Sequence, residues 1–131
     1  EPVRQLFNCN ENCQVVSCDM NFESLVNMDP EHPYESMARR LVYSRWNSGE
    51  KRVETALEAA RSLHVDGVVC FCHWGCKQTM GLSAIFKREL DAAGFPTLIL
   101  NGDGCDRRNA SDGQTATRLN AFLEMLEKRN G

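Results

Sequence analysis

The chain has 131 residues, of which 42% are hydrophobic and 25% are charged, and its formal net charge is −3 at pH 7. This size and composition are typical of a single globular domain that can bury its own core. The negative charge argues against a general nucleic-acid binder, which would be basic, and no apolar run approaches the roughly 20 residues that cross a membrane.

The N-terminal half predicts one strand and two helices. Residues 13–19 form a short apolar run that predicts a buried strand, and residues 21–34, interrupted by two prolines, predict a loop. Helices are expected over residues 35–46 and 50–63. The second helix is amphipathic, because apolar residues recur at helical spacing: Val53, Ala56, Leu57 and Ala60.

The C-terminal half alternates between strand and helix patterns. Residues 64–72 contain a nearly continuous apolar run, which is typical of a strand buried on both faces. A helix is expected over residues 79–93, with Gly94 ending it, and a strand over residues 97–100. The last helix is expected over residues 112–128, with a capping-box spacing between Ser111 and Gln114.

This order of elements predicts an α/β fold in three layers. A small parallel sheet of three to four strands is expected, with helices on both faces, in a flavodoxin-like or Rossmann-like arrangement. A fourth strand would come from residues 1–10; otherwise the sheet packs against a domain outside this chain.

Seven cysteines are a high and odd number for this length. In a small secreted chain they would indicate disulfides, but here they lie near the ends of expected strands. That placement favours free thiols in a reducing cytoplasm, available for metal or redox chemistry.

Parallel strands bring their carboxyl ends to one edge, so the loops that carry Cys18, Cys72 with Cys76, and Cys105 should converge there. Converging thiols suit a metal or iron–sulfur centre. Cys76 is the strongest candidate ligand, because it follows Gly75 and opens a helix whose N-terminus stabilises a thiolate. Cys72 and Cys105 are candidates for an additional metal ligand, and Cys70 is expected to be an ordinary core residue.

Several polar side chains at the same edge are open to two interpretations. Lys77 and Gln78 either contact a substrate or are simply solvated. The loop from Asp103 to Arg108 either binds an anion through its arginines or pairs internally. Gln114, Thr117 and Arg118 share the first turns of the last helix, where they either bind an anion, which a helix N-terminus favours, or form an exposed polar face. Trp74 either walls a pocket or covers the core.

Five blocks of residues occur in order along the second half of the chain: Asp66-Gly67-Val68-Val69, His73-Trp74-Gly75-Cys76-Lys77-Gln78, Gly94-Phe95-Pro96-Thr97-Leu98, Gly102-Asp103-Gly104-Cys105-Asp106-Arg107-Arg108, and Gly113-Gln114-x-x-Thr117-Arg118-Leu119-x-Ala121-Phe122-Leu123-Glu124. As a set, they resemble the C-terminal part of the 2-hydroxyacyl-CoA dehydratase and benzoyl-CoA reductase family. Component D of 2-hydroxyglutaryl-CoA dehydratase is the archetype. The resemblance is close over residues 66–127 and looser before them.

The resemblance implies a [4Fe–4S] cluster held between two α/β domains of a larger subunit. Cys76 matches the cysteine that the C-terminal domain supplies, and the remaining ligands come from an earlier domain. An ATP-hydrolysing activator protein delivers one electron, and the substrate is an acyl-CoA that loses water through a ketyl radical. Related benzoyl-CoA reductases reduce a ring instead.

Two hypotheses follow. In the first, the single domain of residues 1–131 is the C-terminal domain or a fragment of a dehydratase subunit, completed by the rest of that subunit or by a homologous second subunit. Residues expected to line its cluster or substrate are Trp74, Gly75, Lys77, Gln78, Asp103, Asp106, Arg107, Gln114 and Arg118. In the second, the chain is a stand-alone flavodoxin-like binding or electron-transfer module with a thiolate metal site and no dehydratase activity.

Overall fold

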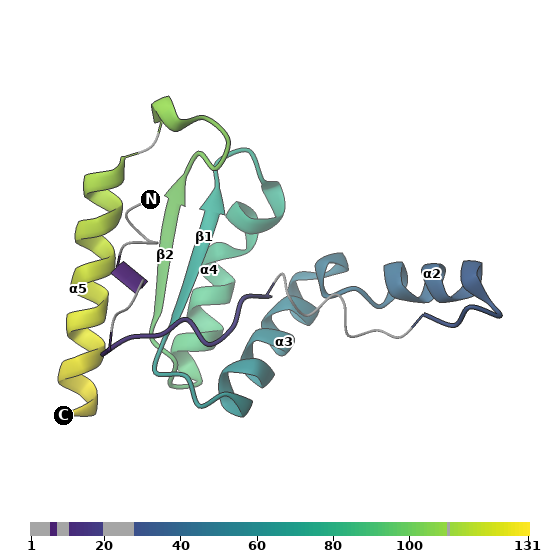
Figure 1. Cartoon of the computed structure of the whole chain (residues 1–131), viewed down its shortest axis with the longest axis horizontal. Helices are drawn as coiled ribbons and strands as arrows, with labels where there is room; N and C mark the ends of the chain where they lie inside the picture. Colours follow the sequence, from purple (N-terminus) through teal and green to yellow (C-terminus); the bar gives the residue numbers. More distant parts are fainter. Residues whose placement is uncertain (1–5, 8–10, 20–27, 110) are drawn as a thin grey trace.

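The computed structural model describes residues 6–7, 11–19, 28–109 and 111–131. The elements follow one another in the order α2 (Pro33–Val42), η2 (Arg45–Asn47), α3 (Gly49–Ser62), β1 (Val68–His73), α4 (Lys77–Ala92), β2 (Thr97–Gly102), η3 (Arg107–Asn109) and α5 (Asp112–Asn130) (Figure 1). The sequence therefore predicted the type and order of the α-helices and β-strands from α3 onwards correctly, but not the short helical turn η3.

The sheet of the described residues consists of β1 and β2, which pair in parallel. The register aligns Val68 with Thr97 at one end and His73 with Gly102 at the other. α4 connects the two strands and contacts both of them. The α/β class and the parallel pairing are thus confirmed.

The strand predicted over residues 13–19 is wrong. Residues 13–18 have no regular secondary structure, and Val15 and Val16 are 62% and 59% exposed. An isolated run of β-branched residues forms a strand only where a neighbouring strand takes up its hydrogen bonds. Within the described residues the sheet has two strands rather than three or four, and most of residues 1–10, the source considered for a fourth strand, lie outside them.

Helices cover the two faces of the sheet. Cys70 and Cys72 of β1 point into a core with Val53 of α3 and with Phe86 and Leu90 of α4. On the opposite side, α5 contacts β2 and buries Leu119 and Phe122 (Figure 1). Helices on both sides of a small parallel sheet agree with the predicted layers, and the flavodoxin-like or Rossmann-like arrangement stays a prediction.

Burial along β1 alternates, which corrects the expectation of a strand enclosed on both faces. Val69 and Phe71 are 42% and 49% exposed, whereas Cys70 and Cys72 are buried. The cause is the position of α5, which makes its main sheet contact with β2 rather than with β1. One face of β1 therefore remains partly open.

The helix ends follow local sequence signals in most places. The Ser48 side chain caps α3 by accepting a hydrogen bond from the N–H of Lys51 at 3.1 Å. Gly94 follows α4 with φ of +92°, a conformation that glycine adopts without strain. The expected capping box at α5 is wrong, because no side chain of the described residues caps that helix.

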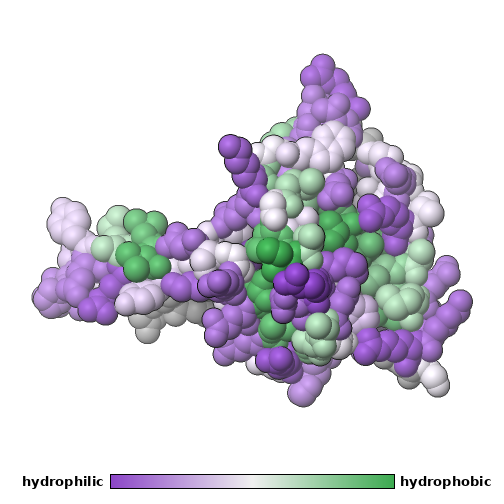
Figure 2. Space-filling view, turned by 180° about the vertical axis from the view of Figure 1, so that it is seen from behind, coloured by the Kyte–Doolittle hydropathy of each residue, from purple (hydrophilic) through white to green (hydrophobic). Residues whose placement is uncertain are grey.

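α2 projects away from the body as an arm (Figure 1). The predicted helix over residues 35–46 is shorter than expected, since α2 ends at Val42 and a separate turn, η2, follows. Most of its large apolar side chains are exposed, and Figure 2 shows hydrophobic surface on this arm. No helix of the described residues is long and apolar enough to cross a membrane.

Candidate functional site

The carboxyl edge of the sheet is built by a tight connection between β1 and α4. The N–H of Trp74 donates to the Gly102 carbonyl at 3.1 Å, which extends the strand pairing by one bond. The N–H of Cys76 then donates to the His73 carbonyl at 2.9 Å and closes a turn. α4 begins at the next residue, so Cys76 lies at the N-terminal end of this helix.

Cys76 has a thiol that ionises more readily than usual. Hydrogen bonding from the Thr79 side chain, and then from the Thr79 backbone N–H, lowers the pKa of Cys76. The Cys76 side chain makes no capping hydrogen bond to the helix, and the Thr79 hydroxyl also donates to the Cys76 carbonyl at 3.4 Å. A partly exposed thiolate at a helix N-terminus is a good metal ligand or nucleophile.

The two cysteines inside β1 have a different environment. Cys72 is fully buried, its sulfur lies 3.9 Å from that of Cys70, and it donates to the Thr79 carbonyl at 3.5 Å. Burial raises the pKa of Cys70 to about 12. Both side chains belong to the hydrophobic core, as expected for Cys70, and the structure does not bring Cys72 to the exposed edge with Cys76.

The loop after β2 is organised by Asp103. One carboxylate oxygen accepts hydrogen bonds from the N–H groups of Cys105 and Asp106, at 2.9 and 3.1 Å. The other accepts from the Asn109 side chain at 2.9 Å. Hydrogen bonding from Asn109, and then from these N–H groups, lowers the pKa of Asp103 to about 2.

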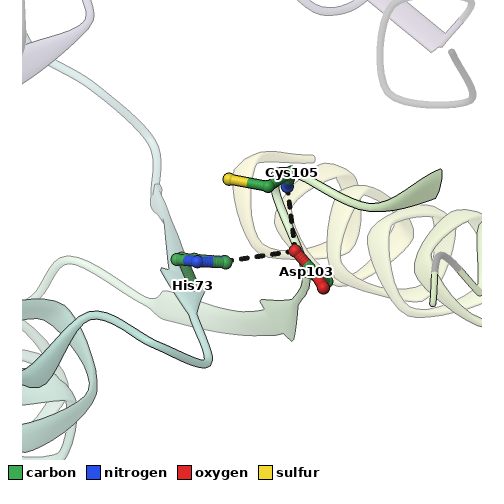
Figure 3. Close-up of side chains that lie close together, drawn as sticks. All are labelled: His73, Asp103 and Cys105. Atoms are coloured by element: carbon green, nitrogen blue, oxygen red, sulfur yellow. Dashed lines mark hydrogen bonds and ion pairs between the residues drawn. The ribbon is translucent and has the colours of Figure 1, made fainter.

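His73, Asp103 and Cys105 come together across the two strand ends (Figure 3). His73 is the last residue of β1, and its Nδ1 lies 3.7 Å from Oδ1 of Asp103. One ligand atom from each of the three residues lies within 4.8 Å of the others. The sulfur of Cys105 extends back towards the imidazole ring. Of the described residues, these are the three that form a group suited to holding a metal ion.

Two features of the site escaped the sequence prediction. His73 was not among the predicted site residues, although the strand register places it opposite Gly102 and so beside Asp103. Arg52 of α3 was also not among the predicted site residues, and it is buried between the rings of Trp46 and Phe86, 4.8 and 5.2 Å from their centroids. Its charge also helps to lower the pKa of Cys76. A sequence pattern gives no sign of such a buried arginine.

The other predicted lining residues differ in exposure and in hydrogen bonding. Trp74, Gly75, Lys77, Gln78 and Gln114 are exposed. The Gln78 side chain donates to the Trp46 carbonyl, and Arg118 donates to the Ile99 carbonyl of β2 at 2.7 Å. Asp106 accepts from Arg108, as in the internally paired interpretation of the loop. The Arg107 side chain lies outside the described part of the structure.

The described cysteines do not supply a complete set of four thiolates, the usual ligands of a [4Fe–4S] cluster. Cys70 and Cys72 are enclosed in the core. The charges of Glu127 and Asp66 act on Cys13, which places that thiol towards the amino end of β1. The described residues could therefore supply only part of such a ligand set, and Cys76 is the partly exposed thiol at the start of α4.

The fold and this edge define an α/β protein with free thiols at the carboxyl ends of parallel strands. The family model described as 2-hydroxyglutaryl-CoA dehydratase, D-component, matches residues 1–126. The chain belongs to this family, as the resemblance predicted, and is thereby related to a dehydratase component. In the other two comparisons, no curated protein and no solved structure matched the chain.

Proposed function

We propose that the chain is the C-terminal domain of a larger [4Fe–4S]-dependent 2-hydroxyacyl-CoA dehydratase subunit and that Cys76 supplies one cluster ligand. The observation that carries the proposal is the Cys76 thiol, partly exposed at the start of α4 with a lowered pKa. Membership of the D-component family supports the dehydratase assignment. When bound, such a cluster supplies the single low-potential electron that activates the acyl-CoA thioester for loss of the hydroxyl group.

In this proposal the residues of the chain bind and orient the cluster and the acyl-CoA substrate. The thiolate of Cys76 would hold iron, while Trp74 and Gly75 form the turn that presents it. Lys77 and Gln78 are the first residues of α4, where the helix N-terminus favours the negative charge of a cluster or of a CoA phosphate. The loop carrying Asp103, Asp106 and Arg107, with Gln114 and Arg118 of α5, lines the same edge.

The proposal also names the partners. The remaining cluster ligands belong to the rest of the subunit or to a homologous second subunit, and an ATP-dependent activator protein delivers the electron. The substrate is an acyl-CoA. The proposed location is the reducing cytoplasm, because the six cysteines of the described residues are free thiols.

Substitution of Cys76 in the assembled dehydratase tests this function. In Cys76→Ser the hydroxyl is a weaker iron ligand, so iron content and the rate of enoyl-CoA formation should both fall. The matched control is Cys18→Ser, an exposed cysteine on another segment, which should retain both. Unchanged iron and unchanged turnover in Cys76→Ser would reject the assignment.

Anaerobic reconstitution of the 131-residue chain alone separates this function from the stand-alone module. The dehydratase domain should assemble little cluster by itself, because the described cysteines do not provide four accessible thiolates. A stoichiometric cluster with a stable absorption spectrum on the isolated chain would favour the electron-transfer module instead.

A further inference from the structure

The group formed by His73, Asp103 and Cys105 is separate from the proposed cluster ligand. It joins the last residue of β1 to the loop that follows β2 (Figure 3). Burial decreases outwards across the group: the side chains of Asp103 and His73 are 16% and 35% exposed, and Cys105 is exposed. The group is therefore held by the scaffold on one side and open to solvent on the other.

We propose that these three side chains form a mononuclear site for a divalent transition metal of the zinc type. Imidazole, carboxylate and thiolate are all ligands of such ions, and three protein ligands leave the fourth tetrahedral position open. A thiolate disfavours Mg²⁺ and Ca²⁺, which take oxygen ligands. This site goes beyond the proposed dehydratase function, since it uses neither Cys76 nor a residue outside the chain.

The distances suit a site that closes around its ion. Ligand atoms of a tetrahedral zinc-type site lie about 3.3 to 3.7 Å apart, given metal–ligand bonds of about 2.0 to 2.3 Å. His73 Nδ1 and Asp103 Oδ1 are already 3.7 Å apart. The complete group spans up to 4.8 Å, so a movement of roughly 1 Å brings the ligands to bonding positions. The exposed side chain of Cys105 is free to make that movement.

Two of the three ligands already present a lone pair that a metal could take up. Asp103 is ionised at neutral pH, because its pKa is about 2. His73 accepts a hydrogen bond at Nδ1 from the Gly104 N–H at 3.0 Å, which assigns the ring proton to Nε2 and leaves the lone pair on Nδ1. Binding through Nδ1 displaces this bond and removes a proton from the Cys105 thiol.

Titration of the reduced 131-residue chain with Co²⁺, a spectroscopic substitute for Zn²⁺, tests the site. We expect 1:1 binding with a thiolate-to-cobalt charge-transfer band, release of about one proton per metal, and displacement of the cobalt by Zn²⁺. Cys105→Ser should remove the charge-transfer band, and His73→Ala should weaken binding by on the order of tenfold or more. Cys76→Ser and Cys18→Ser should bind as the unmodified chain does.

The Gly104 amide resonance provides a second measurement that does not depend on variants. Zn²⁺ should shift this resonance, because the metal takes the place of its hydrogen bond to Nδ1. A charge-transfer band that survives in Cys105→Ser, a band lost in Cys76→Ser, or an unshifted Gly104 amide would each overturn the site. These results are independent of the proposed function, whose failure shows as retained iron and turnover in the assembled Cys76→Ser enzyme and not as a change in cobalt binding.

Discussion

Cys70 and Cys76 lie six residues apart, yet their environments move the pKa of the two thiols in opposite directions. Burial within the sheet raises that of Cys70 to about 12, so this side chain remains a neutral core group. Hydrogen bonding from Thr79 lowers that of Cys76 at the helix N-terminus. Strand and helix ends therefore determine which cysteine of the motif is available for chemistry.

The lowered pKa of Cys76 predicts the pH profile of its alkylation. Because only the thiolate reacts, the midpoint for iodoacetamide modification of Cys76 should fall below the ordinary thiol value of 9.0. Thr79→Val removes the principal donor and should raise this midpoint. Mass spectrometry of the Cys76 peptide measures both profiles.

The matched control is Thr117→Val, which removes a hydroxyl from an exposed position of α5 that donates to the Gly113 carbonyl. That substitution should leave the Cys76 profile unchanged. Identical midpoints in Thr79→Val and the unmodified chain would show that the helix end does not act on the thiol as described.

At the level of elements, the contact of α5 with the start of β1 depends on a glycine. A Cβ at Gly67 would lie 2.9 Å from side-chain atoms of both Phe122 and Leu126. Phe122 is 8% exposed and has little room to move. We expect Gly67→Ala to lower the free energy of unfolding by about 1 to 2 kcal/mol, measured by urea denaturation.

Gly81→Ala is the matched control. Gly81 lies inside α4, and a Cβ there meets no atom within 4 Å. Alanine favours the helix over glycine, so this variant should be more stable by about 0.5 to 1 kcal/mol. Equal stability of the two variants would contradict the close packing of α5 over Gly67.

Comparing the helices and strands with the sequence shows which sequence signals were sufficient to predict them. The apolar runs of β1 and β2 and the amphipathic pattern of α3 predicted the core, because long periodic segments have one favourable way to bury their faces. The strand prediction for residues 13–19 was wrong, since strand formation depends on a partner strand that local sequence does not specify. The grouping of His73 with Asp103 and Cys105 depends on the strand register, which appears only in the folded chain.

For the whole molecule, apolar surface is distributed unevenly. In α2, the residues Tyr34, Leu41 and Val42 are 86%, 69% and 60% exposed. The one buried residue of this helix is Ser36. Val69 and Phe71 on the open face of β1 add further exposed apolar area. The body of the molecule is thus the β1–α4–β2 unit with α3 and α5, and α2 contributes little to its core.

This distribution predicts unequal protection from hydrogen exchange. Amides of α2 should exchange faster than those of α4, because α2 has few buried contacts and opens without disturbing the core. Exchange measured by mass spectrometry on the 131-residue chain checks this order. Equal protection of the two helices would mean that α2 is held by packing that its exposed side chains do not indicate.

The proposed dehydratase function depends on iron being bound by Cys76. The most direct measurement is alkylation of Cys76 in the assembled, reduced dehydratase with its iron present and after the iron has been removed by chelation. We predict that Cys76 is protected while iron is bound and is modified once the iron is gone, whereas the labelling of Cys18 does not change. Equal modification of Cys76 in both states would contradict the central claim.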